Sequence, residues 1–334
     1  EDGQEKISLI IKEFFPENRR LSWNDLKGID ELQDCEVLKN NQGSLFKLNQ
    51  SEYEAIVGES TPQTFETYRV EDALTEVFVT EEKLKNILFS LKNKKNVILQ
   101  GPPGTGKTFI AKRLAYLLFG EKDASRIEMV QFHQSYSYED FIQGYRPDGT
   151  GFKLKNGVFY KFCKTARNDP QNNYVFIIDE INRGNLSKVF GELMMLVEAD
   201  KRGPEWSMPL TYSENIDDKF YVPENLYIIG LMNTADRSLA MVDYALRRRF
   251  AFIDLEPGFR TDAFRQFLLS HGASRELIGT IVRNIDAVNE KIATDTTNLG
   301  KGYSVGHSFF CALPDNGKPD DAWYRHVVRT EIAP

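Results

Sequence analysis

The 334 residues predict about two domains, and the hydrophobic fraction of 41% is enough to bury a core of ordinary size. The net charge of −7, from 42 basic and 49 acidic residues, argues against a uniformly basic nucleic-acid protein, although it leaves room for a local basic groove. No apolar run approaches the length of a membrane span, and three widely spaced cysteines indicate neither a disulfide framework nor a zinc site, so we expect a cytoplasmic protein.

The first 65 residues predict a small N-terminal α+β segment whose role the sequence does not reveal. The chain begins at Glu1 without a methionine, so we expect it to be a piece of a longer protein. Arg19, Arg20 and Trp23 are candidates for DNA contact, but a charged pair beside one aromatic residue is also typical of solvated surface next to core.

A complete phosphate-binding loop, Gly-Pro-Pro-Gly-Thr-Gly-Lys-Thr, occupies residues 101–108, between an apolar strand predicted at 97–100 and a helix predicted at 109–119. Its glycines let backbone N–H groups converge on a polyphosphate, Lys107 supplies a positive charge, and the Thr108 hydroxyl can bind Mg²⁺. The strand before and the helix after argue against an ordinary glycine turn. The predicted nucleotide-binding residues are Pro103, Gly104, Thr105, Gly106, Lys107, Thr108 and Phe109.

A second strand is predicted at residues 127–132, followed by a polar and aromatic stretch at 133–141. Such a stretch can grip a polymer in the pore of an oligomer, but interleaved tyrosine and phenylalanine are also typical of packing. The alternation over residues 152–160, around Asn156 and Gly157, predicts a β-hairpin inserted at this point.

The apolar run at residues 174–178 predicts a strand buried on both faces of a parallel sheet, and it ends in Asp179 and Glu180. Carboxylates at this end of a strand emerge where ligands bind. Asp179 can therefore hold Mg²⁺, and Glu180 can orient and polarise the attacking water. The alternative, that both acids only cap the next helix, is disfavoured because a phosphate loop requires such a partner.

Three elements are predicted between this strand and the next functional motif. Residues 186–197 predict one helix with an apolar face, and residues 210–212 with 219–222 predict a second hairpin. Residues 226–232 predict another buried strand. Its carboxyl end should therefore lie beside the phosphate loop and the acidic pair.

Asn233 and Asp236 follow that strand. Asn233 occupies a position from which an uncharged donor can touch the γ-phosphate and the lytic water, and unlike a lysine it would not neutralise the acidic pair. Asp236, which we also count among the catalytic candidates, has two interpretations: an intramolecular ion pair that braces the loop, or a role at a subunit boundary.

Three consecutive arginines, Arg247, Arg248 and Arg249, close a helix predicted at residues 243–250, before a strand at 250–255. Basic residues in a last helical turn complement the helix dipole, which is one explanation. Consecutive residues point to different faces, however, so one arginine can reach a neighbour's γ-phosphate as a finger while another serves its own subunit.

Helical periodicity from residue 258 onward predicts a small helical lid. His307 lies in its glycine-rich turn at residues 300–307, and we expect a hydrogen-bonded packing histidine there rather than a catalyst.

Together these motifs resemble the AAA+ superfamily, and specifically the McrB family. The match covers about residues 68–334 and leaves out residues 1–65. The stretches that carry it are 101–108, 129–141, 178–183, 232–238 and 244–250.

McrB proteins are the GTP-hydrolysing motors of McrBC modification-dependent restriction systems. The resemblance therefore implies GTP with Mg²⁺ as cofactors, a homo-hexameric ring, stimulation by an McrC-type nuclease subunit, and DNA translocation that leads to methylcytosine-directed cleavage. The expected preference for GTP over ATP rests on this resemblance alone, because the chain lacks the Asn-Lys-x-Asp guanine motif of small GTPases. Backbone groups of residues 77–79 are candidates for contacting the base.

The family's site residues carry over onto this sequence. The resemblance makes Lys107 and Thr108 ligands of phosphate and Mg²⁺, Asp179 and Glu180 the Walker B pair, Asn233 sensor I, Arg248 a finger in trans and Arg249 a sensor in cis. The order of the two arginines is open to exchange.

The predicted fold is α/β. Residues 66–257 are expected to form an AAA+ P-loop NTPase core with a helix-flanked parallel sheet and β-hairpin insertions, and residues 258–334 a helical lid that is truncated.

Two other functions fit part of the pattern. A MoxR-like AAA+ ATPase, acting as a chaperone or protein remodeller, would share the loop and the ring but prefer ATP. A non-catalytic assembly module would bind triphosphate without turnover, although the intact Glu180, Asn233 and arginine cluster argue against it.

Overall fold

The computed structural model describes residues 65–149, 151–213, 215, 217–236, 244–295, 297–314 and 318–333. The α+β segment predicted for residues 1–65 lies outside the described residues, apart from Phe65, and so do Arg19, Arg20 and Trp23. Within the described ranges, every helix is too short or too polar to span a bilayer.

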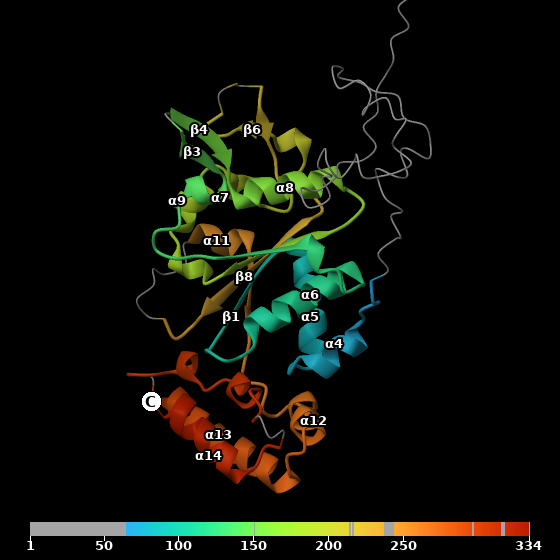
Figure 1. Ribbon diagram of the computed structural model, residues 1–334, viewed down its shortest axis with the longest axis vertical. Helices are drawn as coiled ribbons and strands as arrows, with labels where there is room; N and C mark the ends of the chain where they lie inside the picture. The colour runs from blue at the N-terminus through green and yellow to red at the C-terminus, as the bar shows by residue number, and fades with distance from the viewer. Residues whose placement is uncertain are drawn as a thin grey trace, which may run out of the picture. The chain divides into compact units, whose positions relative to one another are not determined.

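Five parallel strands form the central sheet (Figure 1). Their order across the sheet is β2 (Ile127–Gln131), β5 (Tyr174–Asp179), β8 (Leu226–Asn233), β1 (Asn96–Gly101) and β9 (Ala251–Asp254). Gly101 pairs with Asn233, and Gln131 pairs with Asp179, so the carboxyl ends of four strands meet at one edge. The predicted α/β fold with a parallel sheet is confirmed.

Helices cover both faces of this sheet because successive strand residues point to opposite sides. Val97 and Leu99 pack against one group of helices, and Ile98 packs on the other face. The first group is α4 (Val70–Glu76), α5 (Glu81–Lys94) and α6 (Lys107–Phe119). The second is α7 (Tyr138–Phe141), α8 (Val158–Asn168), α9 (Leu186–Phe190), α10 (Leu193–Leu196) and α11 (Tyr244–Arg249).

The hairpin predicted around Asn156 and Gly157 was placed wrongly. The hairpin is formed by β3 (Gln143–Asp148) and β4 (Gly151–Asn156), with Gly149 at its turn at a φ of +63°. Asn156 ends β4, and Gly157 is the N-cap of α8. The residues after Gly157 form a helix rather than a second strand because α8 buries one face in the core, including Phe159 and Phe162.

The helix predicted at residues 186–197 is two helices. Gly191, at a φ of +51°, separates α9 from α10. The second predicted hairpin exists, but its first strand comes earlier: β6 is Met208–Pro209, β7 is Lys219–Phe220, and residues 211–212 lie in a turn.

The C-terminal lid forms its own apolar cluster beyond β9 (Figure 1). Its helices are α12 (Asp262–Ser270), α13 (Arg275–Thr294) and α14 (Asp321–Val327). Side chains of Thr261, Ser274 and Asp320 cap their N-termini, which fixes where each begins. Short segments complete the description: 3₁₀ turns η3 (Ala124–Arg126), η4 (Ile181–Arg183), η5 (Pro204–Trp206), η6 (Lys301–Tyr303) and η7 (His307–Phe310), and π-helical η8 (Val328–Ile332).

Candidate nucleotide-binding site

The phosphate loop leads directly from β1 into α6. Gly104 and Gly106 have φ values of +76° and +70°, a left-handed conformation that glycine adopts without strain. Gly106 is the N-cap of α6 and no side chain caps that end, so the first N–H groups of this 13-residue helix are left for an anion.

Lys107 is folded back onto the loop that carries it. Its Nζ donates to the carbonyl oxygens of Gly101 at 3.1 Å and Pro102 at 2.8 Å, and the residue is only 8% exposed. Burial lowers the pKa of Lys107 to about 8, while the nearby charges of Glu180 and Asp179 act in the opposite direction. The loop therefore holds a poorly solvated cation beside two carboxylates, and a polyphosphate can replace its carbonyl partners.

Glu180 and Asn233 meet across the ends of neighbouring strands. The Asn233 amide donates from Nδ2 to Glu180 Oε1 at 2.6 Å, and Glu180 is 9% exposed. The Glu180 backbone is left-handed, with a φ of +50°, and its N–H donates to Asp179 Oδ1 at 3.0 Å. A non-glycine residue in this conformation is uncommon and persists only where its surroundings hold it. The turn thereby directs the Glu180 carboxylate toward Asn233 and the loop.

Arg183 is a residue of this site to which the sequence interpretation gave no role. Its Nε donates to Glu180 Oε2 at 3.2 Å, and its Nη2 donates to Asp236 Oδ2 at 3.0 Å. Asp236 therefore forms an intramolecular ion pair, one of its two proposed interpretations, and the partner is Arg183. The available signal was the Asp-Glu-Ile-Asn-Arg spacing, which places Arg183 three residues beyond Glu180, one turn of η4 away.

The oxygen donors suit a magnesium ion that is shared with phosphate. Within the described part of the chain, no three histidine, cysteine or acidic residues cluster as an all-protein metal site. Mg²⁺ in phosphate-binding sites usually takes one or two protein ligands besides phosphate and water. Thr108, in the first turn of α6, and Asp179, at the end of β5, supply a hydroxyl and a carboxylate of that kind.

The lid rests on the phosphate loop through backbone contacts. The Ser308 N–H donates to the Gly104 carbonyl at 2.9 Å. A Cβ added to Gly306 would lie 2.1 Å from the carbonyl carbon of Gly104, so only glycine fits there. His307, between them, is 5% exposed and its Nδ1 accepts from the Gly258 N–H at 2.8 Å. Burial lowers the pKa of His307 to about 4, so it is a neutral packing histidine, as predicted.

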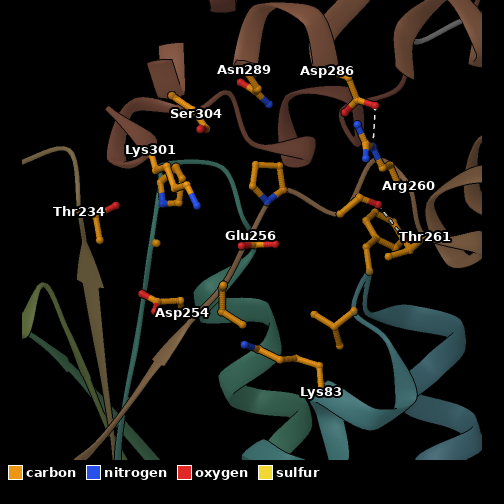
Figure 2. A pocket seen from close by; sticks show the side chains of 18 of the residues that line it. Lys83, Thr234, Asp254, Glu256, Arg260, Thr261, Asp286, Asn289, Lys301 and Ser304 are labelled. Atoms are coloured by element: carbon orange, nitrogen blue, oxygen red, sulfur yellow. Dashed lines mark hydrogen bonds and ion pairs between the residues drawn. The ribbon is translucent and has the colours of Figure 1, made fainter. Parts of the chain in front are cut away.

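A cavity of about 690 Å³ lies between the core and the lid, beside the first residues of the loop (Figure 2). Phe78 and Val79, within the segment expected beside the base, line it. Asp254 and Glu256 project from the end of β9, and Lys301 comes from the lid. A cavity of this size accommodates a small-molecule ligand such as a nucleoside.

The arginine cluster lies at the opposite edge of the sheet. Arg248 Nη2 and Arg249 Nη2 contact Glu198 Oε1 at 2.5 and 3.0 Å. Asn96, at the start of β1, donates from Nδ2 to the Arg249 carbonyl at 3.1 Å. The loop begins at the other end of β1, roughly 17 Å away for a strand of this length. The cis role expected for Arg249 therefore does not fit this placement, because neither arginine lies at the chain's own loop.

Comparison with known proteins agrees with this architecture. Residues 96–250 match the AAA domain family (dynein-related subfamily), and residues 280–334 match the McrB alpha-helical lid domain. Over 270 residues, the chain is 61% identical to the type IV methyl-directed restriction enzyme EcoKMcrB subunit of Escherichia coli (strain K12), covering 80% of this chain and 59% of that protein. Over 222 residues it is 28% identical to the type II restriction enzyme BsuMI component YdiS of Bacillus subtilis (strain 168), covering 54% and 64%.

The chain thus spans about three-fifths of the length of these relatives. A third similarity, 33% identity over 122 residues to the chaperone protein ClpB of Aquifex aeolicus (strain VF5), covers 35% of this chain and 11% of that protein. The predicted AAA+ fold with a C-terminal helical lid is confirmed. The matched AAA domain, the McrB lid and the identity to the Escherichia coli subunit together show that the chain belongs to the McrB family of AAA nucleoside triphosphatases.

Proposed function

We propose that this chain is the GTP-hydrolysing motor part of a methyl-directed DNA restriction complex. The observation that carries the proposal is the convergence of Lys107, Asp179, Glu180 and Asn233 at one edge of the sheet. The 61% identity to a methyl-directed restriction subunit supports the biological context. A homo-hexameric ring, an McrC-type nuclease partner and DNA as the track belong to the same proposal.

Each residue of the site has a role in this scheme. Lys107 turns from the loop carbonyls to the β- and γ-phosphates, and the N–H groups of α6 complete the phosphate cradle. Thr108 and Asp179 would hold Mg²⁺, which supplies positive charge against the developing charge on the phosphates. Glu180, whose carboxylate accepts a hydrogen bond from the Asn233 amide, orients the attacking water and accepts its proton.

The nucleotide base is assigned to the cavity beneath the lid. Guanine presents two adjacent donors, N1–H and the 2-amino group, where adenine presents an acceptor at N1. Asp254 and Glu256, two acceptors in the cavity wall, suit guanine, and the backbone of Phe78 and Val79 offers further contacts (Figure 2). This arrangement supports GTP over ATP.

Steady-state turnover with GTP and with ATP, in the presence and absence of the nuclease subunit, tests the proposal. We expect GTP to be preferred and the nuclease subunit to accelerate its hydrolysis. A preference for ATP together with indifference to the nuclease subunit would favour the chaperone-like alternative. Triphosphate binding without turnover under every condition would favour an assembly module.

A further inference from the structure

The β3–β4 hairpin stands out from the rest of the chain in charge and exposure. It carries three basic side chains, Arg146, Lys153 and Lys155, and one acidic residue, Asp148, in a chain whose net charge is −7. Figure 1 shows it at the end of the described core that lies away from the lid helices. No step of the proposed hydrolysis uses it.

The two faces of the hairpin differ in chemistry. Residues directly opposite each other in an antiparallel pair share a face, and so do residues two apart along a strand. Arg146 pairs with Lys153, and Gly144 pairs with Lys155, so the three basic side chains lie on one face, which also carries Asp148 opposite Gly151 at the tip. The other face carries Tyr145 opposite Leu154 and Pro147 opposite Phe152.

The basic face is not neutralised within the described ranges. Arg146 forms an ion pair with Asp140, but Lys153 and Lys155 are exposed and have no carboxylate within ion-pair distance among the described residues. Like charges placed directly opposite each other destabilise a sheet. Asp140 already compensates the charge of Arg146, so the charge left open to an anion on this face is that of Lys153 and Lys155.

The apolar face presents an aromatic ring near the hairpin tip. Phe152 is 73% exposed, the highest value among the large hydrophobic residues that the structure describes as exposed. The base of the hairpin is fixed, because a Cβ on Gly144 would lie 2.4 Å from Glu139, and the Gly157 N–H donates to the Ile142 carbonyl at 2.6 Å. The ring is thus held out on an anchored projection.

We propose that this hairpin contacts DNA, with Lys153, Lys155 and Arg146 on the phosphate backbone and Phe152 against a sugar or an unstacked base. Cations on one face of a projecting hairpin and an exposed aromatic ring near its tip suit a polymer that alternates phosphates with flat bases. The inference rests on the proposed function, since it names the part of the motor that contacts DNA. It gives the molecule a DNA contact remote from the nucleotide.

The test measures DNA binding of the whole chain by fluorescence anisotropy, with a duplex and a single strand of equal length and a non-hydrolysable GTP analogue present. The double variant Lys153→Gln/Lys155→Gln should weaken binding about tenfold near 0.1 M salt and reduce the slope of log affinity against log salt by about two. Lys92→Gln/Lys112→Gln is the matched control: it removes two exposed lysines from α5 and α6 and should change neither quantity.

Two further variants separate the contribution of the lysine charges to DNA binding from that of the Phe152 ring. Lys153→Arg/Lys155→Arg should restore wild-type affinity, because phosphate contacts need the charge. Phe152→Ser should weaken single-strand binding about tenfold, by loss of stacking, and affect duplex binding less. Equal affinity of the glutamine variant, its control and the wild type would overturn the proposal, as would undetectable DNA binding by the wild-type chain.

Nuclease-subunit binding and GTP turnover without DNA are measured on the same proteins. Loss of nuclease binding with unchanged DNA binding would assign the hairpin to a protein partner and also overturn the proposal. Turnover without DNA should be unaffected by the hairpin variants. An absence of turnover in the wild type would refute the proposed hydrolysis separately, because the hairpin is judged by DNA affinity alone.

Discussion

The carboxyl edge and the amino edge of the sheet carry different groups expected in triphosphate hydrolysis. At the carboxyl edge, Lys107, Asp179, Glu180 and Asn233 form a phosphate site, and Arg183 there is paired with Glu180 and Asp236. At the amino edge, Arg248 is 66% exposed at its side chain and has a carboxylate, but no phosphate loop of its own. This difference supports the proposal that one active centre is divided between two copies of the chain.

The largest expected effect comes from the amino edge. Arg248→Ala should lower GTP turnover on the order of 10³-fold, because a finger in trans stabilises transition-state charge, while nucleotide binding changes little. Arg247→Ala, at the exposed neighbouring position, is the matched control and should stay near the wild-type rate. The measurement is steady-state turnover at saturating GTP and high protein concentration.

Mixing experiments sharpen this prediction. Arg248→Ala chains retain an intact carboxyl edge, and Glu180→Ala chains retain an intact amino edge. If the centre is shared, a mixture should recover part of the activity that neither variant has alone. A mixture as inactive as its components would show that both edges act within one chain.

A somewhat smaller loss is expected from the carboxyl edge itself. Glu180→Ala should lower turnover about 10²- to 10³-fold, through loss of the general base, and keep triphosphate binding. Lys107→Ala should lose binding as well, whereas Lys112→Ala, on the exposed side of α6, should change neither. Wild-type turnover by the Glu180 variant, measured in rapid single-turnover mixing, would remove this residue from the reaction.

The lid that covers the carboxyl edge should respond to acid through His307. The folded pKa of about 4 lies below the ordinary 6.5, so the unfolded chain binds a proton first as the pH falls. The stabilisation is complete above pH 6.5 and lost toward pH 4, by up to roughly 3 kcal/mol. His307→Asn, which can still accept from Gly258, should lose less unfolding free energy over that range in urea titrations. Parallel pH profiles for the two proteins would contradict the assignment.

The smallest effect concerns Lys107 and pH. With its pKa lowered to about 8, the ammonium is lost from the ligand-free loop above that pH, whereas a bound triphosphate favours the charged form. Triphosphate affinity should therefore fall as the pH rises above about 8, by at most tenfold per pH unit. Lys107→Arg stays charged and should bind with little pH dependence, as a fluorescent analogue would report between pH 7 and 9.5.

The sequence predicted the carboxyl edge better than the amino edge for a physical reason. Phosphate loops and buried parallel strands are local patterns, so residues 101–108, β5 and β8 were found within a residue or two. The hairpin turn predicted at Asn156 and Gly157 was wrong because the same pair of residues also suits the N-terminus of a helix. Burial of one face of α8 favours the helix. The same limit applies to α9 and α10, which a single glycine divides.

Contacts between segments far apart in the chain could not be read from the sequence. The Arg183–Asp236 pair, the lid backbone on Gly104 and the shared carboxylate of Glu198 all depend on tertiary placement. Arg249 was assigned to its own nucleotide because sequence order does not show that the end of α11 lies beside the start of β1, away from the phosphate loop.

Glu198 gives the amino edge a resting state. Its carboxylate forms ion pairs with Arg248, Arg249 and Lys201 within one chain, so both arginines are engaged when no second copy is nearby. Under the proposed division of the active centre, a lone molecule is then a dormant one. The rate of hydrolysis per chain then rises with the local concentration of the protein. A cell that makes few copies would therefore have little hydrolysis.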